Sequence, residues 1–131
     1  MINLKNSVFK LVENVKININ CVKTEDAIKI HSNKMNMFVD IRDIIEITKS
    51  DLLLEAKHLL IVVLEFWIDT KSQYYKKFLN KSFNLIFNCS LDWGSALSTH
   101  AANNIGLLTT ANLIGSYNRW LELNGPIEKA K

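Results

Sequence analysis

The sequence predicts an α/β sandwich built around a mainly parallel sheet. Two short runs, residues 37–41 and 83–87, are almost entirely apolar, which is typical of parallel strands buried on both faces. Segments with helical spacing alternate with these runs along the chain, and this alternation favours a sheet packed between helices. The 131 residues are enough for one compact domain.

The N-terminal segment is predicted to form a short amphipathic helix. Apolar side chains recur at helical spacing over residues 4–15. We therefore expect a leader helix within residues 1–16 and one domain over residues 17–128. The domain is expected to begin with a short strand at residues 17–22. Thr24 is then predicted to cap a helix, because two acidic residues follow it in the first turn.

The middle of the chain is ambiguous between strand and helix. Residues 59–63 resemble a strand in composition, whereas residues 64–67 look helical. Periodicity alone does not separate the two possibilities in such short runs.

The C-terminal half gives clearer signals. A helix is predicted over residues 95–105, with one apolar face and with Gly106 where a C-terminal cap is expected. A short strand should follow at residues 111–114. The closing helix should end at the Asn-Gly-Pro run of residues 124–126, since these residues disfavour its continuation.

Composition and charge argue against several classes of function. The net charge of +3 is not gathered into one stripe, so no nucleic-acid partner is expected. The longest apolar run, residues 59–64, is too short to span a bilayer, and residues 1–15 lack the continuous apolar core of a signal peptide. We therefore expect a cytoplasmic protein with no membrane partner.

The chain has two cysteines, Cys21 and Cys89. Two cysteines cannot form a disulfide framework, and no Cys/His pair has the spacing of zinc ligands. We therefore expect free thiols in a reducing compartment and no metal site. Cys21 lies in a short predicted strand with nothing to activate it, so it is interpreted as inert.

Cys89 has a more informative position. It follows a buried strand and precedes a loop and a helix, and ligands bind at the carboxyl ends of parallel strands. The loop N–H groups and the positive end of the following helix would both favour the thiolate, which is the reactive form. A buried, inert cysteine is the alternative, and placement alone leaves both interpretations open.

Several motifs resemble the rhodanese superfamily, especially its bacterial single-domain branch. The segment NCSLDWGSA, residues 88–96, is similar to the active-site loop of that family. The segment FVDIRD, residues 38–43, with a glutamate three residues later, resembles another family motif. Further matches are AKH at 56–58, LEFWID at 64–69, and the C-terminal run from 114 to 127. Order and spacing agree from about residue 19 to residue 128.

The resemblance implies a rhodanese-like fold, with a central parallel five-stranded sheet flanked by helices, and a sulfurtransferase activity. Cys89 would be the nucleophile, carrying sulfur as a persulfide from thiosulfate or a persulfide donor to a thiol or cyanide acceptor. No metal or organic cofactor is implied. The substrate would be bound by the loop residues that follow the cysteine, namely Ser90, Leu91, Asp92, Trp93, Gly94 and Ser95.

Two loop residues depart from the family pattern. Gly94 replaces an arginine suited to a sulfonate, and the loss of such a charged hydrogen bond costs about 1.5–3 kcal/mol. Asp92 replaces a glycine, and its carboxylate would oppose a thiolate by about 0.7 kcal/mol in a watery setting. The sequence therefore leaves a second hypothesis open, a rhodanese-fold binding module with little turnover. Ser95 stands where Cys-based phosphatases need an arginine, which argues against phosphatase activity.

Other candidate residues receive structural interpretations. Asp40 and Arg42 follow a strand end, and we expect them to support the site by bracing loops through an ion pair. His58 and His100 lack an identified partner and are interpreted as structural or solvent-facing. The apolar residues 59–63 are a candidate homodimer contact.

Overall fold

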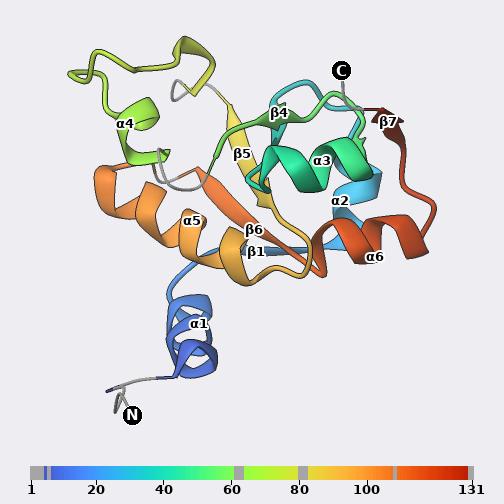
Figure 1. Ribbon diagram of the computed structural model, residues 1–131, viewed down its shortest axis with the longest axis horizontal. Helices are drawn as coiled ribbons and strands as arrows, with labels where there is room; N and C mark the ends of the chain where they lie inside the picture. The colour runs from blue at the N-terminus through green and yellow to red at the C-terminus, as the bar shows by residue number, and fades with distance from the viewer. Residues whose placement is uncertain (1–4, 6, 61–63, 80–82, 108, 130–131) are drawn as a thin grey trace.

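The two apolar runs of the sequence form neighbouring parallel strands. The computed structural model describes residues 5, 7–60, 64–79, 83–107 and 109–129 (Figure 1). Its elements in chain order are α1 (Val8–Ile17), β1 (Cys21–Lys23), α2 (Thr24–Ile30), β2 (Asn36–Asp40), α3 (Ile44–Lys49), β3 (Asp51–Leu53), β4 (Lys57–His58), α4 (Leu64–Ile68), the 3₁₀ turn η2 (Lys77–Leu79), β5 (Asn84–Asn88), α5 (Trp93–Ile105), β6 (Thr110–Ile114), α6 (Ser116–Glu122) and β7 (Ile127–Lys129).

The central sheet has five strands in the order β1-β6-β5-β2-β4, and every neighbouring pair is parallel. This confirms the predicted fold class. Asp40, the last residue of β2, lies opposite Asn88, the last residue of β5. The two strands therefore end side by side at the carboxyl edge of the sheet, where ligands bind in parallel α/β folds.

Successive side chains of the inner strands point to opposite faces of the sheet. Phe38 and Ile86 pack in one buried cluster with Trp120 of α6, whereas Val39 and Phe87 pack in another, which includes residues of α4 and α5. Figure 1 shows α1, α4 and α5 grouped on one side of the molecule and α2, α3 and α6 on the other. The result is a three-layer sandwich.

A second, two-stranded sheet was not predicted. Strands β3 and β7 pair antiparallel, with Leu53 opposite Ile127. The indole N–H of Trp120 donates to the carbonyl of Pro126 at 2.8 Å, which fixes the chain between α6 and β7. Each strand has only three residues, too few for an alternating pattern to be visible in the sequence.

The leader helix extends beyond its predicted end. Helix α1 is capped by Ser7, whose hydroxyl oxygen accepts from the N–H of Lys10 at 3.2 Å, and it continues to Ile17. The strand predicted at residues 17–22 is therefore wrong in its bounds, because β1 comprises only Cys21–Lys23.

Thr24 does not cap helix α2 with its side chain, so that prediction is wrong. Its hydroxyl donates to the carbonyl of Ile114 at 2.5 Å, which ties the start of α2 to the end of β6. The side chain satisfies a strand end in the tertiary structure instead of its own helix.

The ambiguous middle of the chain is resolved in part. Residues 64–67 lie within helix α4, as their composition indicated. Leu59 and Leu60 lie outside any strand, and residues 61–63 lie outside the described residues, so the strand-like interpretation of residues 59–63 is not supported where it can be tested.

Candidate active site

Cys89 lies directly after β5, in a short loop that leads into helix α5. Its side chain is half-buried, and its thiol is free. The carbonyl of Cys89 accepts from the N–H of Tyr117 at 3.0 Å, and the carbonyl of Ser90 accepts from the N–H of Asn118 at 3.2 Å. The start of α6 therefore fixes the backbone on which the thiol is carried.

Two backbone N–H groups converge on the sulfur. The N–H of Asp92 lies 3.2 Å from Sγ and the N–H of Ser95 lies 3.4 Å from it. Such a concave set of N–H donors favours an anion at its centre. Among the predicted loop residues, Asp92 and Ser95 thus face the sulfur with their backbones.

Buried side-chain hydroxyls complete the surroundings of the sulfur. Sγ lies 3.5 Å from the hydroxyl of Ser95 and 4.0 Å from that of Ser116. The Ser95 hydroxyl donates to Oδ1 of Asn112 at 2.6 Å, and the Ser116 hydroxyl donates to the carbonyl of Leu113 at 3.0 Å. Because each hydroxyl has one hydrogen and donates it elsewhere, both present lone pairs toward the sulfur. Either hydroxyl oxygen can therefore accept a hydrogen bond from the thiol.

Sequence reasoning missed Ser116 and Asn112. Both are fully buried, and the Ser116 hydroxyl also accepts from the N–H of Cys89 at 3.2 Å. A signal for Ser116 was present, because it follows Gly115 directly after strand β6, next to β5 in the sheet. Polar residues at adjacent carboxyl ends of parallel strands converge on one site.

The expected repulsion by Asp92 is reduced by two partners. Its carboxylate binds Nζ of Lys16 at 2.8 Å and accepts from the N–H of Gly115 at 3.1 Å. Asp92 adopts φ 102°, a left-handed conformation that favours glycine, the residue of the family pattern. A cation from helix α1 therefore compensates a charge in the loop that follows Cys89, an interaction that the sequence alone did not indicate.

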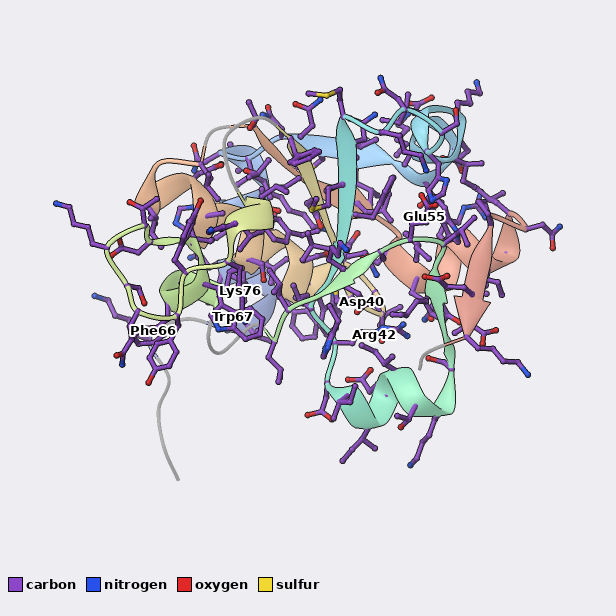
Figure 2. All side chains as sticks on the ribbon, turned by 90° about the horizontal axis from the view of Figure 1, so that it is seen from above. Asp40, Arg42, Glu55, Phe66, Trp67 and Lys76 are labelled. Atoms are coloured by element: carbon purple, nitrogen blue, oxygen red, sulfur yellow. The ribbon has the colours of Figure 1, made fainter. Side chains whose placement is uncertain are left out.

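Asp40 and Arg42 form a buried ion pair next to the loop (Figure 2). The guanidinium makes several hydrogen bonds to the Asp40 carboxylate, and it also donates to the hydroxyl of Ser50 and the carbonyl of Asp51. It stacks on the ring of Tyr117, 4.0 Å from the ring centre. These contacts fit the bracing role expected for the pair and leave the guanidinium occupied.

The histidines have structural partners. A ring nitrogen of His58 lies 2.6 Å from the carbonyl of Arg42, and a ring nitrogen of His100 lies 3.3 Å from the side chain of Asn104. Trp93 packs edge-on against Phe9 of α1, with ring centres 5.1 Å apart, and also borders the cavity beside Cys89.

A pocket of ≈ 460 Å³ opens beside the thiol. Its charged lining residues are Arg42, Asp43 and Glu46, and Glu46 accepts a hydrogen bond of 3.0 Å from the hydroxyl of Ser90. The lining residues include Ile41, Arg42, Asp43, Glu46, Leu60, Cys89, Ser90, Leu91, Trp93 and Gly94. Of the predicted loop residues, Ser90, Leu91, Trp93 and Gly94 thus line a pocket large enough for a small molecule.

Within the described residues, no group of three or more His, Cys, Asp or Glu side chains is placed to hold a metal ion. None of the described helices is both long and apolar enough to cross a membrane.

The fold defined by this sheet order and its flanking helices is the rhodanese-like fold. Among solved structures it is similar to the rhodanese-like domain of the Anabaena protein Alr3790, with a TM-score of 0.70 and 15% identity over 84% of this chain and 79% of that one. It is also similar to the human single-domain sulfurtransferase TSTD1, with a TM-score of 0.68 and 18% identity over 78% of this chain and 95% of that one.

A more similar structure is that of RPA3614 from Rhodopseudomonas palustris, a protein of unknown function described as a possible tyrosine phosphatase. It aligns with a TM-score of 0.93 and 28% identity over 98% of both chains. No protein-family model and no curated protein matches the chain. The resemblance seen in the sequence motifs is thereby confirmed at the level of the fold.

Proposed function

We propose that this protein is a rhodanese-type sulfurtransferase that carries sulfane sulfur on Cys89. The observation that supports this most directly is the pair of backbone N–H groups, from Asp92 and Ser95, directed at Sγ. The free thiol, the adjoining pocket and the fold shared with a known sulfurtransferase are consistent with it. The proposed setting is the cytoplasm, where a free thiol persists.

The proposed reaction conserves atoms and electrons. The Cys89 thiolate attacks the outer sulfur of a donor, one S–S bond forms, and the bond between that sulfur and the rest of the donor breaks. With a persulfide RSSH, the leaving thiolate RS⁻ takes the bonding pair and is then protonated. A thiol or cyanide acceptor later attacks the outer sulfur and regenerates the Cys89 thiolate.

Tyrosine phosphatase activity is a second candidate because RPA3614 is described in that way. The site offers little support for it. A phosphate dianion needs a cation in the loop, whereas Ser95 occupies the position at which Cys-based phosphatases need an arginine, and the Arg42 guanidinium is paired with Asp40. A rhodanese-fold binding module remains the other alternative, since Asp92 and Gly94 replace the usual glycine and arginine.

The test is intact-mass analysis after incubation with thiosulfate and, separately, with a persulfide donor. The Cys21→Ser variant should gain the mass of one sulfur atom and lose it on addition of cyanide, whereas Cys89→Ser should gain none. Equal labelling of Cys89→Ser, or no labelling of Cys21→Ser, would overturn the proposal. Hydrolysis of an aryl phosphate that depends on Cys89 would support the phosphatase instead.

A further inference from the structure

We propose that the pocket beside Cys89 selects neutral and cationic persulfides over anionic sulfur donors such as thiosulfate, and that Glu46 determines this preference. The inference rests on the proposed function and goes beyond it by naming the charge class of the substrate. The inference depends on the charges that line the pocket: the cation has a counter-charge, whereas two carboxylates have none.

The cation that borders the pocket is already neutralised. The Arg42 side chain is 3% exposed, its guanidinium is 2.8 Å from Oδ2 of Asp40, and its remaining hydrogen bonds go to Ser50 and Asp51. Lys16 is likewise bound to Asp92 at 2.8 Å. Among the described lining residues, no other lysine or arginine is present to bind a sulfonate.

Two carboxylates face the same space. Glu46 on α3 is exposed, and its Oε2 accepts from the hydroxyl of Ser90, the residue next to the nucleophile. Asp43 caps helix α3, with its Oδ1 accepting from the N–H of Ile45 at 2.8 Å, and it also lines the pocket. Within the described part of the chain, neither carboxylate takes part in an ion pair, so the mouth of the pocket is acidic.

The rest of the wall is apolar. Ile41, Leu60, Leu91 and Trp93 line the pocket, and the side chains of Leu91 and Trp93 are largely exposed. Three of these four side chains are purely hydrocarbon, so this wall suits the hydrocarbon stem of an organic persulfide better than the charged oxygens of thiosulfate. Electrostatics and shape thus favour the same donor class.

The test uses matched persulfides of cysteamine, 2-mercaptoethanol and 3-mercaptopropionate, whose ammonium, hydroxyl and carboxylate groups contribute charges of about +1, 0 and −1 at neutral pH. In the Cys21→Ser background we expect sulfur loading of Cys89 to fall in that order, by about threefold per unit charge at low ionic strength. Thiosulfate should be slower than all three. Added salt should reduce the differences in loading rate among the three persulfides, because it screens solvent-exposed charges.

Glu46→Gln keeps an acceptor for Ser90 and removes the charge, so the ratio of cation to anion rates, which spans two charge units, should fall by up to about ninefold. Glu65→Gln, an equal charge change at an exposed position of α4 outside the pocket, should leave the ratio unchanged. Equal rates across the series, faster loading by the anion, or no effect of Glu46→Gln would overturn the inference.

A second measurement separates this inference from the proposed function. Cys89 is modified with aminoethyl and sulfonatoethyl methanethiosulfonate, and each rate is divided by the rate for free 2-mercaptoethanol. Preference for the cationic reagent together with loading by no persulfide would reject sulfur transfer while retaining the acidic pocket. Loading by every donor at one rate, with no reagent preference, would reject only the selectivity.

Discussion

At the scale of single residues, Asp92 shows how an unfavourable local choice is compensated. A non-glycine residue in the left-handed region costs about 1–2 kcal/mol, and a carboxylate close to a nucleophilic sulfur opposes its ionisation. Asp92 nevertheless directs its N–H at Sγ, while Lys16 and the N–H of Gly115 hold its carboxylate. The backbone of Asp92 therefore supplies one of the two N–H groups that face Sγ, while Lys16 and Gly115 compensate its charge.

The first prediction concerns the two loop departures. Asp92→Gly combined with Gly94→Arg should raise thiosulfate loading about tenfold to a hundredfold, because an arginine would restore a charged hydrogen bond of about 1.5–3 kcal/mol to the sulfonate. The measurement is the rate of sulfur gain at Cys89 with thiosulfate. The single Asp92→Gly change is the control and should gain much less. Unchanged loading in the double variant would contradict the prediction.

At the scale of elements, helix α1 belongs to the site although it precedes the sheet. Val12 and Val15 pack with Ala96 of α5 in a small buried cluster, Phe9 contacts Trp93, and Lys16 reaches Asp92. Figure 1 shows α1 lying against α5, the helix that follows the Cys89 loop. The helix supplies both a packing surface and a compensating cation.

The second prediction tests that link. Lys16→Met leaves the Asp92 carboxylate without its cation, so alkylation of Cys89 by iodoacetamide at neutral pH should slow by about threefold. Lys10→Met, on the same helix but in no ion pair among the described residues, is the matched control and should have no effect. In an Asp92→Asn background, Lys16→Met should lose its effect. An undiminished effect there would assign the slowing to altered packing of α1 instead.

At the scale of the whole molecule, the buried pair of Asp40 and Arg42 joins the central sheet to the smaller one. Asp40 ends β2, while Arg42 binds the first residue of β3 and stacks on Tyr117 of α6 (Figure 2). The hydroxyl of Tyr117 accepts from the N–H of Asp51 at 2.9 Å. Both Arg42 and Tyr117 therefore bind the start of β3.

The third prediction follows from the burial of this pair. Asp40→Asn should lower the free energy of unfolding by about 3–5 kcal/mol, because it leaves the Arg42 guanidinium buried without a counter-charge. Urea denaturation followed by circular dichroism measures the change. Glu25→Gln is the control: it removes the exposed partner of Arg119, and it should cost less than about 1 kcal/mol. Equal losses for the two variants would contradict the prediction.

The sequence predicted the parts of the fold that depend on local pattern. Apolar runs identified β2 and β5, and a glycine after an apolar face located the end of α5 at Gly106, which has φ 120°. The pairing of β3 with β7 and the hydroxyl network of Ser116 and Asn112 depend on contacts between distant segments. No local pattern encodes these contacts, so they appear only in the folded chain.

The candidate site was likewise predicted only in part. The place of Cys89 after a strand singled it out, and the resemblance of residues 88–96 to the rhodanese loop assigned it and its loop to the site. The role of Lys16 was not predicted, since 76 positions separate it from Asp92. The same limitation explains the error at Thr24, whose side chain bonds to Ile114, 90 positions away. Polar contacts between residues far apart in the chain could not be predicted from the sequence.

If Cys89 carries a sulfur atom as proposed, the order of the strands also decides how that atom leaves the protein. Cys21 lies on the edge strand β1, and β6 separates it from β5, which carries Cys89. Two strand spacings amount to roughly 10 Å, beyond the roughly 7 Å that a disulfide can bridge between α-carbons. Cys21 therefore cannot serve as a resolving thiol within the same molecule. A loaded protein would keep its cargo until a second molecule approached through the pocket, so discharge would depend on acceptor concentration.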